Sequence, residues 1–153
     1  MAHFAHLDEN NNVIEVVVIP DEFGEDENGV FSEERALPFL RRAADDPLAS
    51  WKQTSYNNNI RGNYAAIGGK YYPEEDVFIG PSPYDSWVVD LPNLGWQSPL
   101  GPPPTPPVTD PPSFYYWDEN LYNYDNTQGW VLETPPPYDA ATDPDPPGPE
   151  PTP

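Results

Sequence analysis

The hydrophobic positions near the N-terminus follow the two-residue period of β-strands. Residues 3–7 alternate in type and residues 13–19 are rich in Val and Ile, with an Asp/Asn cluster at 8–12 between them. Two such segments around a polar cluster predict a hairpin with a loop of about five residues. Because residues 16–19 are apolar at every position, they are predicted to form a strand in the middle of the sheet, covered on both faces.

A helical pattern follows. Ser32 is a suitable N-cap, two carboxylates come directly after it, and two arginines fall near residue 42, where the helix dipole favours them. Apolar residues on one side of this segment would face a core. Pro38 lacks a backbone N–H, so we expect either a helix that begins near Ser32 and is kinked at Pro38, or one that begins close to Pro38.

The segment from residue 51 to residue 90 predicts a small antiparallel meander. Short aromatic or β-branched stretches are separated by Asn and Gly clusters, the pattern of strands joined by tight turns. The expected strands cover residues 51–56, 63–67, 70–72 and 77–79. The stretch that follows, up to Trp96, is expected to be extended and aromatic-rich with no core of its own, so its rings must pack on the sheet or on a neighbouring protein.

The composition changes after Gln97. Of the 24 prolines, 17 lie in the last 55 residues, and proline cannot supply the N–H groups of helices and central strands, so the domain is predicted to span residues 1–97. Residues 98–112 read as a semi-rigid proline spacer. Residues 113–133 predict an aromatic β-hairpin, and residues 134–153 an acidic, proline-rich tail that is disordered unless bound.

These elements together predict an α+β fold. It would consist of a small, mainly antiparallel β-sheet with one short helix, followed by an extended C-terminal arm rich in proline and aromatic residues. A lone two-stranded hairpin is marginally stable in water, so the hairpin of the arm is expected to pack against the domain or a partner.

The charge is strongly negative and unevenly distributed. The formal net charge is −20, every Lys, Arg and His lies at or before Lys70, and 14 acidic residues follow from Tyr71 onward. A field of this sign repels phosphate and anionic lipid, so binding to nucleic acid or to a membrane surface is not expected. It suits solubility, or docking on a basic protein surface.

Several classes of protein are excluded by residue type. The chain has no cysteine, which removes disulfides, thiolate catalysis and Cys-ligated metal sites. The longest apolar run is far shorter than the ~20 residues that cross a bilayer. The N-terminus also lacks the basic-then-apolar pattern of a signal peptide. We therefore expect a soluble protein made in a cytoplasm.

Candidate chemistry is sparse. His3 and His6 are three residues apart on a predicted strand and face opposite sides, so they are not expected to share a metal. The acidic runs lack the spacing of an EF-hand, which favours solvated loop charge over calcium. No serine lies in a nucleophile elbow, and the Gly68-Gly69-Lys70 sequence is more typical of a turn than of a phosphate-binding loop. We expect neither an enzyme nor a cofactor.

The aromatic residues of the second half are the most informative feature. Large, rigid rings bury much area at low entropic cost when an extended arm grips another protein. We therefore predict that they bind a partner, with packing in the chain's own core as the alternative. The predicted partner-binding residues are Tyr84, Trp87, Trp96, Tyr115, Tyr116, Trp117, Trp130 and Tyr138.

A series of short motifs runs in order along roughly residues 1 to 130. It comprises MAHFA at 1–5, DENNNVI at 8–14, Trp51 with QTSY at 53–56, RGNYA at 61–65, IG at 67–68, Asp76 with Phe78, PY at 83–84 with SW at 86–87, and YWDE at 116–119. This series resembles a family of small, mostly uncharacterised proteins of marine bacteriophages, cyanophages especially. The resemblance implies phage origin and a place in the virion, and it transfers no catalytic residue. The chain departs from the family pattern in its longer proline spacer and its acidic tail.

The composition and the resemblance together predict a bacteriophage virion accessory structural protein. A capsid decoration or cement subunit is favoured, made in the host cytoplasm and present in multiple copies per particle. It would bind other virion proteins, capsid or tail subunits, through its aromatic and proline-rich arm. The alternatives are a tail, neck or baseplate component and a nonstructural chaperone of tail or fibre assembly, with an enzyme as a third, less favoured possibility.

Overall fold

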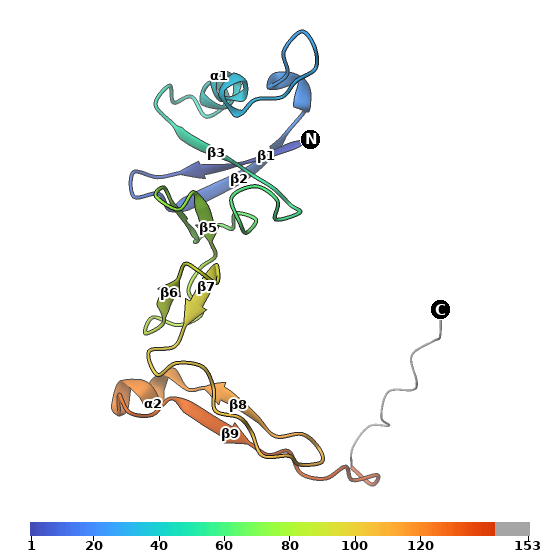
Figure 1. Cartoon of the computed structure of the whole chain (residues 1–153), viewed down its shortest axis with the longest axis vertical. Helices are drawn as coiled ribbons and strands as arrows, with labels where there is room; N and C mark the ends of the chain where they lie inside the picture. The colour runs from blue at the N-terminus through green and yellow to red at the C-terminus, as the bar shows by residue number, and fades with distance from the viewer. Residues whose placement is uncertain (143–153) are drawn as a thin grey trace. The chain divides into compact units, whose positions relative to one another are not determined.

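The structure is a computed structural model that describes residues 1–142. The chain forms two compact units, Met1–Pro99 (unit 1) and Leu100–Pro153 (unit 2) (Figure 1). Short antiparallel sheets together with one main helix of 11 residues confirm the α+β class. Residues 143–153, the end of the predicted acidic tail, lie outside the described residues.

Unit 1 is built on a three-stranded antiparallel sheet. β1 (Ala2–Leu7) and β2 (Val13–Ile19) form the predicted hairpin, and β3 (Ser50–Thr54) pairs with the other side of β1, which gives the order β2-β1-β3. The prediction that residues 16–19 lie in the middle of the sheet is wrong. The chain returns from the helix to place β3 beside β1, and β2 is therefore an edge strand.

Both faces of this sheet are covered. Side chains alternate along a strand, so β1 sends Phe4 to one face and Ala5 to the other. Phe4 is fully buried beneath the helix with Leu40 and Trp51, whereas Ala5 packs in a second cluster with Tyr71, Phe78 and other residues on the opposite face. Burying a side chain the size of Phe4 contributes roughly 1.5–3 kcal/mol. The two clusters therefore hold the sheet between the helix on one face and the segment that carries Tyr71 and Phe78 on the other.

The helix α1 (Glu33–Ala43) begins where the first of the two alternatives places it. The Ser32 hydroxyl caps it by accepting a hydrogen bond from the Arg35 N–H at 3.3 Å. Pro38 lies inside the helix, and because it has no N–H the carbonyl of Glu34 lacks its usual helical donor. Glu34 is exposed, so water can take that place. A short 3-10 helix, η1 (Asp21–Phe23), precedes α1.

Only part of the predicted meander forms. β4 (Lys70–Tyr72) and β5 (Val77–Ile79) pair as expected, but residues 63–67 contain no strand. Arg61 has a φ of 53°, in the left-handed region that turns the chain before this segment. The Ala65 N–H then donates to the Thr54 hydroxyl at 2.9 Å, so a side chain replaces the strand neighbour.

The stretch after β5 also differs from expectation. β6 (Val88–Asp90) and β7 (Gly95–Gln97) pair antiparallel, so the predicted extended exit is a small hairpin instead. In its turn the Asp90 carboxylate accepts a hydrogen bond from the Asn93 side-chain amide at 2.8 Å. Asp and Asn side chains favour such turns because they hydrogen-bond locally.

Unit 2 contains β8 (Phe114–Trp117), α2 (Glu119–Tyr124) and β9 (Trp130–Glu133). The two aromatic strands pair antiparallel over four residue pairs. The helix between them is not among the elements predicted from the sequence. Asp118 caps α2 by accepting a hydrogen bond from the Leu121 N–H at 3.0 Å, which is the usual role of an aspartate before a first turn.

Candidate protein-binding surface

The hairpin of unit 2 has an interior of its own, centred on Trp117. This side chain is only 5% exposed, and its ring meets Trp130 edge to face at 5.2 Å and Tyr122 of α2 at 5.3 Å. Its indole N–H donates to the Glu119 carboxylate at 3.0 Å. A Cβ on Gly129 would lie 2.4 Å from the Trp117 ring, so only glycine permits this packing. Trp117, a predicted partner-binding residue, belongs to the interior of unit 2.

The proline segment is fastened along this hairpin at both ends. At the α2 end, the Trp130 indole N–H donates to the Gly101 carbonyl at 3.1 Å. At the other end, the Ser113 hydroxyl lies 2.5 Å from the Thr109 hydroxyl and 3.0 Å from that of Thr134. Figure 1 shows the segment running beside β8 and β9 between these ends. Residues 102–108 remain exposed.

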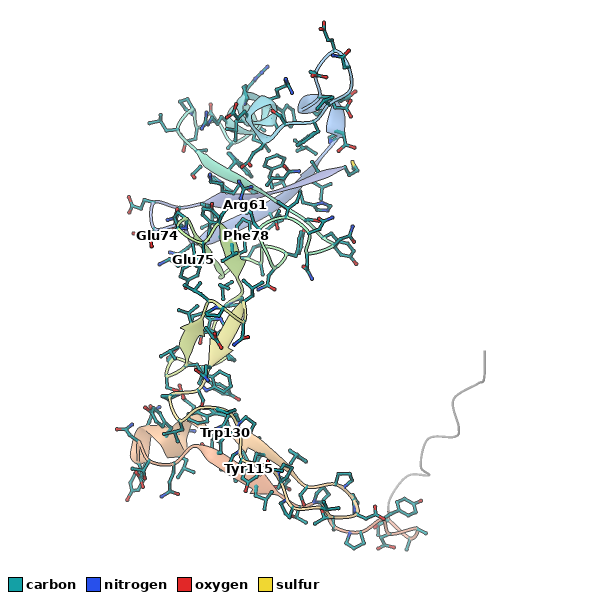
Figure 2. The ribbon with its side chains drawn as sticks, viewed as in Figure 1. Arg61, Glu74, Glu75, Phe78, Tyr115 and Trp130 are labelled. Atoms are coloured by element: carbon teal, nitrogen blue, oxygen red, sulfur yellow. The ribbon has the colours of Figure 1, made fainter. Side chains whose placement is uncertain are left out.

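The opposite side of the hairpin carries exposed rings. Phe114 and Tyr116 are two residues apart on β8 and therefore share one face, where they are 49% and 43% exposed. The strand register places Val131 opposite Tyr116 and Glu133 opposite Phe114. We call these four residues the outer face. Tyr115 and Trp130 lie on the inner side with Trp117 (Figure 2).

The remaining predicted residues are spread over both units. In unit 1, the rings of Tyr84 and Trp87 lie 5.6 Å apart and are half-buried, and the Trp96 indole N–H donates to the Gly80 carbonyl at 2.8 Å. These three rings are packed within unit 1. In unit 2, Tyr138 follows β9 and is half exposed.

Sequence reasoning left Phe114 out of the predicted set. The signal was available in the alternation of the four-residue stretch FYYW, which puts its first and third rings on one face and its second and fourth on the other.

Unit 1 contains one cluster of charged side chains, centred on Arg61. Its Nε donates to Asp76 at 2.7 Å, and its Nη1 donates to Glu33 at 2.9 Å and to the Gln53 carbonyl at 3.0 Å. The Tyr71 hydroxyl also donates to Asp76. Figure 2 shows Arg61 beside Phe78, whose N–H donates to the Arg61 carbonyl. The cluster links α1, β3 and the β4–β5 hairpin.

The electrostatics of this cluster follow from its hydrogen bonds. The pKa of Asp76 is lowered, first by the hydrogen bond from the Tyr71 hydroxyl and then by the hydrogen bond from Arg61. The pKa of the Tyr71 hydroxyl is raised, first by burial and then by its hydrogen bond to Asp76. These shifts favour an ionised Asp76 carboxylate and a protonated Tyr71 hydroxyl beside the Arg61 guanidinium. The polar groups are satisfied by one another, which makes the cluster a cross-link between layers.

Comparison of the chain with protein family models, with curated proteins and with solved structures finds no match. Within residues 1–142, no group of three or more His, Asp or Glu side chains could hold a metal ion, and no helix is long and apolar enough to cross a membrane. The acidic loops use their carboxylates locally, as where Asp8 accepts hydrogen bonds from the N–H groups of Asn10 and Asn12.

Proposed function

We propose that this protein is an accessory structural protein of a bacteriophage particle, a capsid decoration or cement subunit that binds a neighbouring virion protein through the outer face. The observation that carries the proposal is the pair of exposed rings, Phe114 and Tyr116, beside half-buried Val131. Neighbouring exposed rings on a sheet are typical of protein-binding surfaces, because docking removes a large apolar area from water.

The support beneath the outer face strengthens the proposal. Trp117, Trp130 and Tyr122 pack behind it, and the proline segment is tied to both ends of the hairpin. The two rings are therefore presented by strands that are ordered before a partner arrives. Binding then costs less conformational entropy than it would for a flexible arm.

The charge indicates the kind of partner. Glu133 lies on the outer face, and no basic residue follows Lys70 in the chain. A partner surface that is basic, or apolar with a basic rim, complements this field, whereas an acidic one is repelled. The phage assignment itself rests on the ordered motifs of residues 1 to 130.

The proposal is tested with purified particles of the encoding phage. Phe114→Ser with Tyr116→Ser should lower attachment of the added protein at least tenfold, because truncating two central rings costs about 1.4 kcal/mol or more. Tyr124→Ser is the matched control: Tyr124 is 92% exposed on α2 and is not one of the four residues of the outer face, so its loss should leave attachment unchanged. Equal attachment of the double variant and the control would refute a role for the outer face.

Mass spectrometry of the particles tests the place in the virion. A decoration subunit should be present in hundreds of copies, and a few copies would indicate a tail, neck or baseplate component instead. Absence from particles together with presence in assembly intermediates would indicate a chaperone.

A further inference from the structure

The two edge strands of the sheet in unit 1, β2 and β3, differ in the contacts that their outward-facing backbone groups make. At the β3 edge, the Gln53 N–H donates to the Glu33 carboxylate at 3.2 Å and its carbonyl accepts from Arg61 at 3.0 Å. Arg41 of α1 likewise donates to the Ala49 carbonyl just before β3. Side chains thus occupy the β3 edge, and a further strand cannot pair at Gln53.

The register shows which backbone groups point outward at the β2 edge. Gln53 of β3 directs its backbone N–H and carbonyl away from β1. Phe4, which lies opposite Gln53 on β1, must therefore direct its backbone N–H and carbonyl toward β2, where Val17 is its partner. Neighbouring residues alternate, so Val16 and Val18 point their backbone groups away from β1. The loop at Gly68 and Gly69 covers the start of this edge, where the Val13 N–H donates to the Gly69 carbonyl at 2.9 Å and the Val13 carbonyl accepts from the Gly68 N–H at 3.0 Å. Beyond it, within residues 1–142, no side chain or loop backbone bonds to Val16 or Val18.

The side chains of β2 also leave this edge unprotected. The strand has seven residues, of which only Glu15 is charged, and Ile14 and Val18 are 49% and 48% exposed. Natural edge strands are usually short, or carry lysine, proline or a bulge that discourages pairing. Here the one irregularity lies at the start of the strand, opposite His6 and Leu7, and the stretch from Glu15 onward is regular.

We propose that the β2 edge is an interface between two copies of this chain, in which β2 pairs antiparallel with β2 of the second copy. The two three-stranded sheets then become one sheet of six strands. A two-fold axis at Val17 places Val16 opposite Val18 of the other copy, so that Val16 and Val18 of each strand gain hydrogen-bond partners.

The pattern of β2 suits self-pairing. In this register Glu15 lies opposite Ile19, and the two Glu15 carboxylates are about 13 Å apart along the strands, beyond the Debye length of about 8 Å at physiological salt. Like charges therefore do not oppose each other directly. On the α1 side, a cavity of about 150 Å³ borders the same edge; apart from Glu15 its lining is apolar and includes Val17 and Phe39, and a second β2 would extend this apolar wall.

Salt distinguishes a second copy from a basic partner. Two chains that each carry a net charge of −20 repel each other, and added salt screens that repulsion while leaving strand pairing and apolar burial in place. Self-association at the β2 edge should therefore strengthen as salt increases. Binding of a basic protein at the same edge would weaken.

The test is sedimentation of the full chain over a range of protein concentrations. We expect a dimer whose fraction rises from about 0.01 M to about 1 M NaCl, as the Debye length falls from about 30 Å to about 3 Å. A chain that is monomeric at every concentration and salt level, or a dimer that dissociates as salt increases, would overturn the proposal.

A pair of variants locates the interface. Val18→Pro removes an outward N–H at a position where an edge strand accepts proline, and should raise the dimer dissociation constant at least tenfold. Val18→Thr keeps the N–H and the β-branched shape, and should leave the constant close to that of the unchanged chain. Equal dimerisation of the two folded variants would exclude this edge.

Hydrogen exchange of the unchanged chain gives a reading that does not depend on a variant folding. The amides of Val16 and Val18 should exchange at least tenfold more slowly at high protein concentration than at low concentration, because pairing buries them. A dimer that forms without slowing these two amides has its interface elsewhere, and the proposal fails.

Discussion

Replacing Arg61 by methionine should destabilise unit 1 by about 3 kcal/mol. Methionine keeps much of the length of the side chain but removes all three hydrogen bonds that join α1, β3 and the β4–β5 hairpin. It also leaves the Glu33 and Asp76 carboxylates without their shared cation. Arg61 is the suitable target because its side chain is only 15% exposed, so water cannot replace the lost bonds fully.

The magnitude follows from the exposure of each partner. Asp76 is more than half exposed, and a pair of that kind contributes about 0.5 kcal/mol. The bonds to Glu33 and to the Gln53 carbonyl are better shielded, and each charge-assisted bond contributes roughly 1.5 kcal/mol. For a unit of this size the combined loss lowers Tm by roughly 10–20 °C.

The assay is urea unfolding of the full chain, followed by circular dichroism at the helix band, to which α1 contributes the longest helix. Arg35→Met is the matched control. Arg35 lies 3.7 Å from Asp26 at an exposed site, and its loss should cost less than about 1 kcal/mol. Arg61→Lys should fall between the two, because one ammonium cannot reach three acceptors. Losses for Arg61→Met and Arg35→Met that agree within about 0.5 kcal/mol would mean that the three bonds of Arg61 contribute no more than one exposed ion pair.

Two further predictions concern other positions. Gly129→Ala should destabilise unit 2 by about 1–3 kcal/mol and change its near-ultraviolet circular dichroism, because the new Cβ overlaps the buried Trp117 ring; an unchanged spectrum and stability would contradict that packing. The lowered pKa of Asp76 contributes stability that is present above its unfolded value of about 3.9 and is lost as pH falls through the folded pKa. The raised pKa of Tyr71 contributes stability that is present below about 10 and is lost as pH rises through the folded pKa. Urea midpoints across pH should therefore fall less steeply in acid for Asp76→Asn and in alkali for Tyr71→Phe than for the unchanged chain, and parallel curves would argue against either linkage.

Local signals in the sequence were sufficient where the cause of an element is local. The Asp/Asn cluster after Leu7 specifies a hairpin loop, and Ser32 specifies the start of α1, because both act through hydrogen bonds to residues a few positions away. The outer face could also have been found from alternation in β8. Trp117 could not have been separated from the other predicted partner-binding residues by composition, since only the packing of Gly129 and α2 against it makes it an interior residue.

The errors arose where partners are distant in sequence. Val16 and Val17 are half-buried against different clusters, so apolar residues on both faces correctly indicated two covering layers. They did not indicate which strands lie beside β2. Because β3 pairs with β1, β2 has a neighbour on one side only. The segment at 63–67 has strand-forming residues, but the left-handed turn at Arg61 and the hydroxyl of Thr54 give its backbone other partners.

The two proposed surfaces lie in different units, so one copy of the chain can use both. A dimer formed at the β2 edge carries two outer faces, and a second attachment to the same particle is then governed by an effective concentration rather than by free diffusion. Val18→Pro touches no residue of the outer face, yet it should weaken attachment to particles by removing this bivalency. Phe114→Ser with Tyr116→Ser should instead leave the dimer intact and lower attachment at least tenfold. The reverse pattern, with Val18→Pro attaching normally, would mean that the outer face acts one copy at a time.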